Sequence, residues 1–170
     1  MGQFVMYKLT KAQMEDFEPF LALKSQKDAI KWSGFSAAPE RDTFRRYYEE
    51  RVLANPNTVI MFLRDLEVDG APIIGYIQYD ILSNDEVELR GSVIKKSYQG
   101  IGANIVMSEL LFQELRAEGF KKAYGWVADN NLPSVLNAER RGYIKTEVAE
   151  IRQLPLLGGD TLFHKWVKEI

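Results

Sequence analysis

Apolar and polar side chains alternate most clearly between residues 86 and 93, where the even positions are charged or carry a hydroxyl and the odd positions are apolar or small. This period of two predicts a strand with one buried face. Residues 58–66 and 72–82 are rich in β-branched and aromatic side chains, and Asp69-Gly70 lies between them, so we expect a hairpin there. Further strands are predicted at 3–9, 121–128, 143–151 and 161–170.

In the segments between these strands, apolar side chains recur every three or four residues, which is the spacing of an amphipathic helix. We expect helices at about 10–24, 41–55, 102–119 and 131–142. In the first of them Lys24 follows the same spacing as the apolar residues. Residues 28–40 contain Trp32, Gly34 and Pro39 and are expected to be irregular.

The order of the predicted elements is β-α-α-β-β-β-α-β-α-β-β. Such an order predicts an α+β fold with a single mixed, mostly antiparallel sheet of six to seven strands flanked by helices. The 170 residues contain no internal repeat and no linker rich in serine or proline, so we expect one domain over residues 1–170.

Composition excludes several classes of function. The 22 basic and 24 acidic residues give a net charge of −2 without long runs of one sign, which argues against a nucleic-acid or membrane-surface partner. With no cysteine and one histidine, the chain lacks residues for disulfides, thiolate chemistry or a multi-histidine metal site. His164 is expected on an edge strand or at the surface. We see no secretory signal or membrane span, and expect a soluble cytoplasmic protein.

The segment most informative about chemistry is the turn between the strand at 86–94 and the helix that begins near Gly102. Backbone N–H groups at the start of such a helix form a cradle for phosphate. The letters around Gly100 and Gly102 match neither a Walker loop nor the full dinucleotide-binding fingerprint, so those uses of the cradle are excluded. The turn can therefore still bind a ligand of another class that carries phosphate.

These residues resemble the GNAT superfamily of acyl-CoA-dependent N-acetyltransferases. Gln99-Gly100-Ile101-Gly102-Ala103-Asn104 is similar to that family's pyrophosphate loop, although Asn104 departs from its final small residue. An alternative register, with Ser97, Gly100 and Gly102, keeps both glycines but loses the glutamine. Downstream, Asn131-Leu132-Pro133-Ser134 followed by Arg141-Gly142-Tyr143 resembles a second family signature at the expected separation.

The resemblance implies that acetyl-CoA is the acyl donor and that no metal takes part. The pyrophosphate would lie on the amides of Gly100 to Asn104, and the pantetheine arm would pair with the strand edge at Ser92, Val93 and Ile94. Asn131 and Ser134 would contact the arm from the other side. Taken singly, these residues also have ordinary explanations, as turn glycines, a helix N-cap and a residue of the first helical turn.

For catalysis the resemblance points to Glu88 as the base that removes a proton from the amine through a water, with Glu86 as the second candidate. Glu88 is expected to share a face of its strand with Ser92 and Ile94. The alternative role for Glu88 is a solvated charge paired with Arg90 or a lysine of the next strand. This chain departs from the family at two positions. Trp126 stands where some members have a general base, and Ala138 stands where many have a tyrosine that acts as the general acid.

The proton donor to the leaving thiolate is therefore open. Tyr124 is our candidate, with Tyr98, Tyr143 and water as alternatives.

The acceptor site is expected to be aromatic, with Trp32, Tyr47, Trp126 and Glu86 as its contacts. We expect a small amine or amino sugar as the acceptor, then a protein or peptide amine, in a monomer or homodimer. Two other interpretations stay open: a CoA-binding regulatory module with reduced catalysis, and a globular interaction domain.

Overall fold

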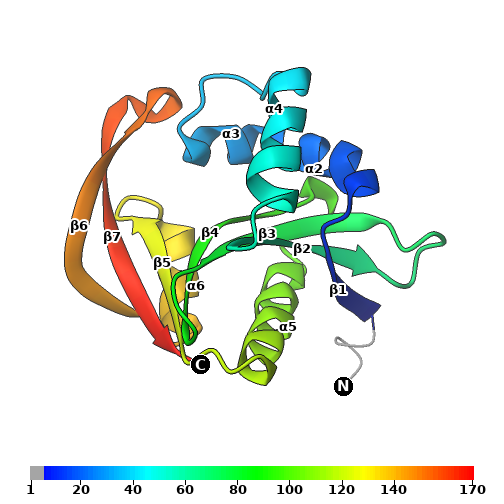
Figure 1. Cartoon of the computed structure of the whole chain (residues 1–170). Helices are drawn as coiled ribbons and strands as arrows, with labels where there is room; N and C mark the ends of the chain where they lie inside the picture. Colours follow the sequence, from blue (N-terminus) through cyan, green and yellow to red (C-terminus); the bar gives the residue numbers. More distant parts are fainter. Residues whose placement is uncertain (1–5) are drawn as a thin grey trace.

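The computed structural model describes residues 6–170, and the strands of this part of the chain form one sheet (Figure 1). They are β1 (Tyr7–Lys11), β2 (Thr58–Asp65), β3 (Ile73–Ile81), β4 (Glu86–Ile94), β5 (Lys122–Ala128), β6 (Ile144–Leu154) and β7 (Gly159–Glu169). Their order is β1-β2-β3-β4-β5-β7-β6, and only β4 and β5 run parallel. The prediction of a mixed, mostly antiparallel sheet with as many as seven strands is confirmed.

Among residues 6–170, five α-helices flank the sheet, with α2 to α4 on one side and α5 on the other (Figure 1). They are α2 (Phe17–Lys24), α3 (Lys27–Ser33), α4 (Arg41–Tyr47), α5 (Ala103–Ala117) and α6 (Leu132–Arg140). A π-helical segment, η2 (Tyr48–Leu53), continues α4. Within residues 6–170 no helix combines the length and the apolar composition needed to cross a membrane.

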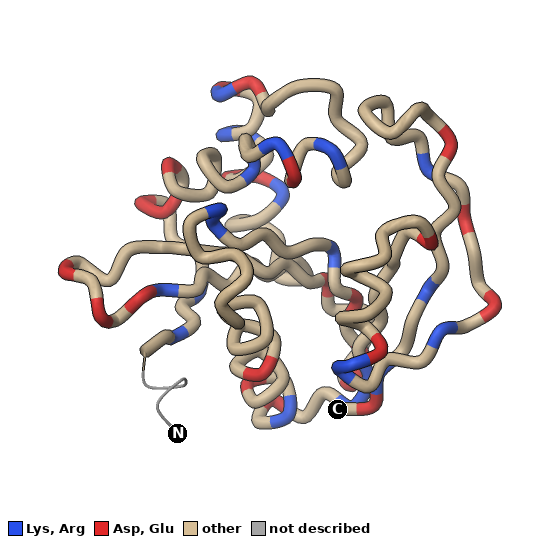
Figure 2. The backbone as a smooth tube through the Cα atoms, turned by 180° about the vertical axis from the view of Figure 1, so that it is seen from behind, with Lys and Arg blue, Asp and Glu red and all other residues tan. Residues whose placement is uncertain are grey.

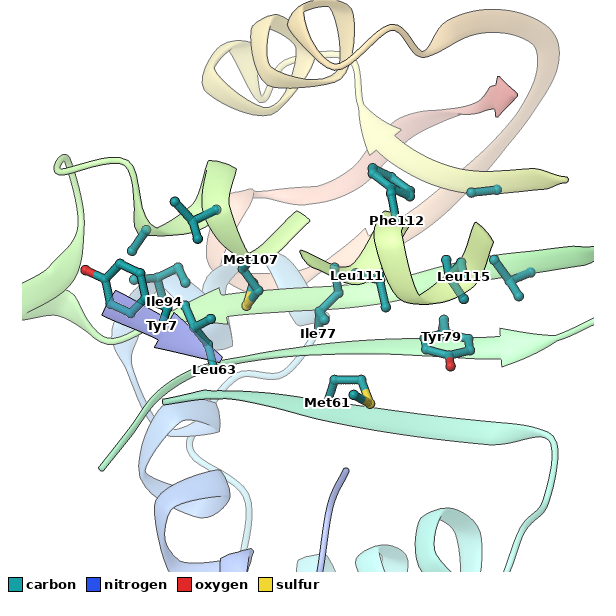
Figure 3. Packing of buried hydrophobic residues seen from close by; sticks show 14 of the residues in the cluster. Tyr7, Met61, Leu63, Ile77, Tyr79, Ile94, Met107, Leu111, Phe112 and Leu115 are labelled. Atoms are coloured by element: carbon teal, nitrogen blue, oxygen red, sulfur yellow. The ribbon is translucent and has the colours of Figure 1, made fainter. Parts of the chain in front are cut away.

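Apolar side chains on both faces of the sheet hold these layers together. On one face Met107, Leu111 and Leu115 of α5 pack against side chains such as Leu63 and Ile77 of the central strands (Figure 3). On the other face an aromatic cluster joins α2 and α4 to β2 and β3 through Phe20, Phe44, Tyr48, Phe62 and Tyr76. A shift of the pairing by one residue would expose the buried side chains of both faces, so burial on the two faces specifies the register of the sheet.

The prediction that residues 28–40 are irregular is wrong for their first part, because α3 covers Lys27–Ser33. This helix has only two turns and buries one apolar side chain, Ile30, so it offers too short a pattern for helical periodicity to be read. Gly34 ends it with φ of +86°. The first strand lies at Tyr7–Lys11, later than the predicted 3–9, of which residues 3–5 lie outside the described part.

A β-bulge in β4 changes which side chains face each layer. Tyr79 pairs with Leu89 and Gln78 pairs with Gly91, so Arg90 is the extra residue. Leu89 packs on the α5 side of the sheet before the bulge, and Ile94 does so after it. The expectation that Glu88 and Ile94 share a face is therefore wrong: Glu88 lies on the face covered by α2 to α4.

Strands β4 and β5 pair only over Glu86–Glu88 and Lys122–Tyr124 and then diverge. Beyond that point residues 89–94 leave the backbone groups on one side of β4 without a strand partner. Parallel pairing is slightly weaker per residue than antiparallel pairing, and the bulge next to the divergence bends β4 further from β5. The result is an opening in the middle of the sheet, directed at the start of α5.

Candidate active site

A cleft of about 620 Å³ follows the diverging part of β4; we call it the splay cleft. It runs between α2 and α3 on one side and the turn before α5 and the start of α6 on the other. Among its lining residues are Arg90, Gly91, Ser92, Val93, Ile94, Gln99, Gly100, Gly102, Ala103, Asn104, Asn131 and Ser134. The structure therefore brings together almost all residues that the sequence motifs assigned to a cofactor; Ile101, 64% exposed, does not line the cleft.

The turn at the end of this cleft has the form of an anion cradle. Gly100 and Gly102 have φ of +79° and +87°, values that favour glycine, and a Cβ at either position would meet no heavy atom of the described chain within 4 Å. The N–H groups of residues 100–105 make no hydrogen bond within the described chain. They lie at the positive end of α5, so their donors and the helix dipole both favour a bound anion.

One buried acceptor lies beside these donors. The side-chain oxygen Oδ1 of Asn104 is buried in the wall of the splay cleft and lacks a partner anywhere in residues 6–170. Unpaired buried acceptors are costly, so this oxygen is expected to receive a hydrogen bond from a bound molecule or water. Asn104, the position that departs from the family motif, thus adds an acceptor next to a group of donors.

Gln99 connects this turn to β4. Its Nε2 donates to the carbonyl oxygen of Ile94 (2.9 Å) and to Oδ2 of Asp28 (2.9 Å). Gln26 also donates to the Ile94 carbonyl (3.1 Å) and accepts from the backbone N–H of Lys96 (2.9 Å). The Ile94 carbonyl is therefore already occupied by two side-chain amides, which leaves Ser92 and Val93 as the part of the strand edge open to a ligand.

Asn131 and Ser134 lie across the splay cleft at the start of α6. The Oδ1 of Asn131 accepts a hydrogen bond from the backbone N–H of Ser134 (3.4 Å), so Asn131 caps the helix. Both side chains line the cleft as well. The structural role of Asn131 and a contact to a ligand are compatible, because capping uses only its oxygen.

A second cleft, of about 810 Å³, lies on the same face of the sheet, between α4 with η2 and strands β2 to β4; we call it the polar cleft. Its lining residues are Lys24, Thr43, Arg46, Tyr47, Glu50, Arg51, Asn55, Thr58, Gln78, Asp80 and Arg90. Lys24 and Arg90 line both clefts, so the clefts meet between these two side chains. Tyr47, predicted to contact the acceptor, lines this second cleft, and its hydroxyl accepts from Gln78 (3.1 Å).

The candidate base Glu88 lies beside that junction. Trp126 donates its indole N–H to Glu88 Oε1 (2.6 Å), and Arg90 Nη1 is 3.5 Å from Glu88 Oε2. The Glu88 side chain is 15% exposed. The structure thus contains the predicted pairing with Arg90, and Trp126 is the partner of the carboxylate rather than a base itself.

Glu86 and Tyr124 form a second pair where β4 and β5 are joined. Tyr124 donates its hydroxyl to Glu86 Oε2 (2.9 Å), and this hydrogen bond, with some burial, raises the pKa of Tyr124. The two hydrogen-bonded pairs therefore lie next to each other on β4 and β5. None of their four residues lines either cleft; they are Glu86, Glu88, Tyr124 and Trp126. Trp32 lies elsewhere, in the wall of the splay cleft.

The other two tyrosines considered as acids have different surroundings. Tyr98 lines the splay cleft, but its hydroxyl donates to Asp65 (2.5 Å), which raises the pKa of Tyr98 to about 12. Tyr143 packs against Phe112 of α5, and burial raises its pKa. The Tyr98 proton is thus used in the hydrogen bond to Asp65, and Tyr143 does not line the cleft, so neither hydroxyl is placed to donate a proton into it.

His164 lies on β7, which is an interior strand between β5 and β6, so its placement on an edge is wrong. Its Nδ1 is 2.7 Å from Asp129 Oδ1, and the ring is mostly buried. Lys145 lies 3.7 Å from the same oxygen. No group of three potential metal ligands is found among the described residues.

Lys24 is the main site residue that sequence reasoning did not single out. Its ammonium lies 5.7 Å from the centroid of the Tyr76 ring, and burial lowers the pKa of Lys24. The signal in the sequence was a lysine at an apolar position of the first helix. The sequence indicated Arg90 only as a possible partner of Glu88, because its position between the two clefts depends on the bulge in β4.

Residues 14–143 match the model of the acetyltransferase (GNAT) family, so this chain belongs to that family. No curated protein sequence matches the chain significantly.

Solved structures show the same fold at low sequence identity. Spermidine N-acetyltransferase from Vibrio cholerae, in complex with CoA and spermine, superposes with a TM-score of 0.80 at 14% identity, over 97% of this chain and 96% of that one. The ribosomal-protein-S18-alanine N-acetyltransferase from Escherichia coli has a TM-score of 0.70 at 16% identity, with 97% and 94% covered. A ribosomal-protein-alanine N-acetyltransferase from Brucella melitensis has a TM-score of 0.71 at 14% identity, covering 96% and 99%.

Proposed function

We propose that this protein is an N-acetyltransferase that moves an acetyl group from acetyl-CoA directly to a primary amine in a ternary complex. The observation that carries the proposal is the row of N–H groups at residues 100–105, which have no hydrogen-bond acceptor within residues 6–170 and lie at one end of a cleft that follows the open edge of β4. These donors suit a pyrophosphate, and the strand edge at Ser92 and Val93 suits the amides of a pantetheine arm. Asn131 and Ser134 would contact the arm from α6.

In the proposed reaction the neutral amine attacks the thioester carbonyl carbon, a C–N bond forms, and the C–S bond breaks. The substrate ammonium first loses a proton, and the nitrogen loses another as the tetrahedral intermediate collapses. The CoA thiolate takes one proton from solvent, so one proton is released per turnover. Backbone N–H groups on the open edge of β4 are the donors that would stabilise the oxyanion.

Glu88 is the base in this proposal, acting through a water at the junction of the two clefts. The Trp126 indole fixes one carboxylate oxygen and Arg90 faces the other, so the carboxylate has a defined position next to a residue that lines both clefts. A carboxylate held in this position can accept a proton from the amine through a bridging water.

A CoA-binding module with reduced catalysis is the second candidate. It is favoured by Ala138, which is buried where many family members have a tyrosine, and by the position of Glu88 outside the lining of both clefts. The two candidates share the CoA cleft and differ in turnover.

Two measurements on the full chain test the proposal. At about 100 times its dissociation constant, acetyl-CoA should raise the free energy of unfolding by roughly 2.7 kcal/mol, measured by thermal or urea unfolding. Release of free thiol from acetyl-CoA should then depend on added amine. Stabilisation without amine-dependent thiol release would favour the module, and the absence of stabilisation would contradict both candidates.

Gln99→Ala tests whether the turn must be held against β4. The change removes the hydrogen bonds from Gln99 to the Ile94 carbonyl and to Asp28, each with a net value of about 0.5–1.5 kcal/mol. We expect acetyl-CoA affinity to fall about three- to thirty-fold in a titration followed by calorimetry. Asp42→Ala, a change at an exposed position of α4, is the control and should bind normally. Wild-type affinity in Gln99→Ala would show that the turn keeps its shape without this side chain.

A further inference from the structure

The polar cleft has an unusual charge for a chain with net charge −2. Lys24, Arg46, Arg51 and Arg90 line it together with Glu50 and Asp80, so four cations face two carboxylates in the lining. Glu88 lies behind the lining, 3.5 Å from Arg90, and reduces the excess to one positive charge. Basic and acidic residues are otherwise mixed along the chain (Figure 2). Positive potential focused in a cleft raises the local concentration of anions and lowers that of cations.

The acidic residues do not neutralise this excess. Asp80 accepts a hydrogen bond from the Thr58 hydroxyl (2.9 Å) and lies 3.5 Å from Arg90 Nε, so its charge is already matched by Arg90. Within the described part of the chain, Lys24, Arg46 and Arg51 form no ion pair. The guanidinium groups of Arg46 and Arg51 come from neighbouring turns of one helical segment, α4 with η2, and reach the same cleft.

Lys24 is the most informative of these cations because its side chain is partly buried at the place where the two clefts meet. Its only charged or aromatic partner in residues 6–170 is the ring of Tyr76. An ammonium that is buried without a carboxylate is costly, and burial accordingly lowers its pKa. A bound anion would supply the missing partner and offset the cost of burial.

The position of Lys24 places the positive charge of the polar cleft next to the expected site of acyl transfer. Lys24 and Arg90 line both the splay cleft and the polar cleft, and Arg90 begins the β4 segment 90–94 whose other end leads to the cradle at residues 100–105. A thioester whose pyrophosphate lies at that cradle would have its acyl group directed at this junction. The polar cleft is therefore the space into which an acceptor would extend.

We infer that the acceptor amine carries an anionic group, a carboxylate or a phosphate, which binds in the polar cleft between Lys24, Arg46 and Arg51. The inference rests on the proposed function and names its substrate class: a zwitterionic amine such as a free amino acid. The sequence led us to expect a simple amine or an amino sugar as the acceptor. We now expect an acceptor that carries an anionic group in addition to its amine. A polyamine would place several positive charges in a cleft that already has an excess of them.

Matched acceptor pairs test this inference in the thiol-release assay with the full chain. Methionine, phenylalanine, threonine and glutamine are each compared with their carboxamides, and ethanolamine phosphate is compared with ethanolamine for the phosphate case. We expect kcat/KM to be at least tenfold higher for the anionic member of the preferred pair, and spermidine to be a poor acceptor. Because amidation lowers the pKa of the amine and increases the free base, the carboxamide comparison is biased against the inference.

Arg46→Gln should reduce the ratio of kcat/KM between the anionic and the uncharged member of a pair several-fold. Lys24→Met should reduce this ratio further. Arg45→Gln is the matched control: it removes the same charge one residue earlier on α4, where Arg45 pairs with Glu49 outside the cleft. Equal or higher kcat/KM for the uncharged members, or a preference for spermidine, would overturn the inference and leave the proposed function standing. Acetyl-CoA binding without acetylation of any acceptor would overturn both.

Discussion

Gly102→Val is expected to weaken acetyl-CoA binding at least a hundred-fold. Gly102 has φ of +87° immediately before α5, and no heavy atom of the described chain lies within 4 Å of where a Cβ would be. That space is the cradle in which the pyrophosphate would lie. A valine would fill it with methyl groups and would push the backbone away from a conformation that branched residues avoid, so the N–H groups of the turn would be displaced.

The measurement is ligand-dependent unfolding. At a concentration about 100 times the wild-type dissociation constant, acetyl-CoA should stabilise the wild type by roughly 2.7 kcal/mol and a variant with hundred-fold weaker binding by only about 0.4 kcal/mol. Gly70→Val is the control, because Gly70 has φ of +83° and equally open surroundings but lies between β2 and β3. It should lose similar stability and keep its affinity. Gly102→Ala provides a milder variant if the valine prevents folding. Normal affinity in a folded Gly102 variant would contradict the cradle.

Glu88→Gln is expected to lower kcat by about 10²- to 10⁴-fold while acetyl-CoA affinity stays unchanged. Glutamine has the same shape, and its amide oxygen can still accept the indole N–H of Trp126, so the surroundings of residue 88 should be preserved. What it cannot do is accept a proton from the amine at neutral pH. Activity of the variant should recover partly at high pH, where more of the amine is already neutral.

Glu86→Gln is the natural comparison. Glu86 lies on the same face of β4, also accepts a hydrogen bond from a β5 side chain, and also lies outside both clefts. We expect it to retain most of the activity. If Glu86→Gln lost turnover while Glu88→Gln kept it, Glu86 would be the base. Full activity in both variants would mean that water alone removes the proton.

The sequence pattern predicts well those parts of the fold that depend on residues close together in the chain. The aliphatic repeat at Met107, Leu111 and Leu115 predicted α5 and its buried face, and the glycines before it predicted the cradle. Both depend on side-chain spacing and on backbone conformations that few residues other than glycine adopt. The assignment of Glu88 to a face failed, because alternation counts positions along a strand and cannot detect an inserted residue.

The bulge at Arg90 is such an insertion, and it exists only relative to β3. It moves Ile94 to the face opposite Glu88 and places Arg90 between the two clefts. Lys24 illustrates the same limit: its spacing marked it as part of a buried face. Only the packing of α2 over Tyr76 shows that its ammonium lies at the junction of those clefts, where the described chain gives it no acidic partner.

By itself the sequence determined the order and type of most elements, the glycine turn, and the family resemblance, since each of these depends on residues close together in the chain. Tertiary structure alone decided where β4 leaves β5, which side chains line each cleft, and how the charges of α2, α4 and β4 add up in one space. The physical reason is that strand register, burial and electrostatic potential are sums over residues distant in sequence, and no short segment contains them.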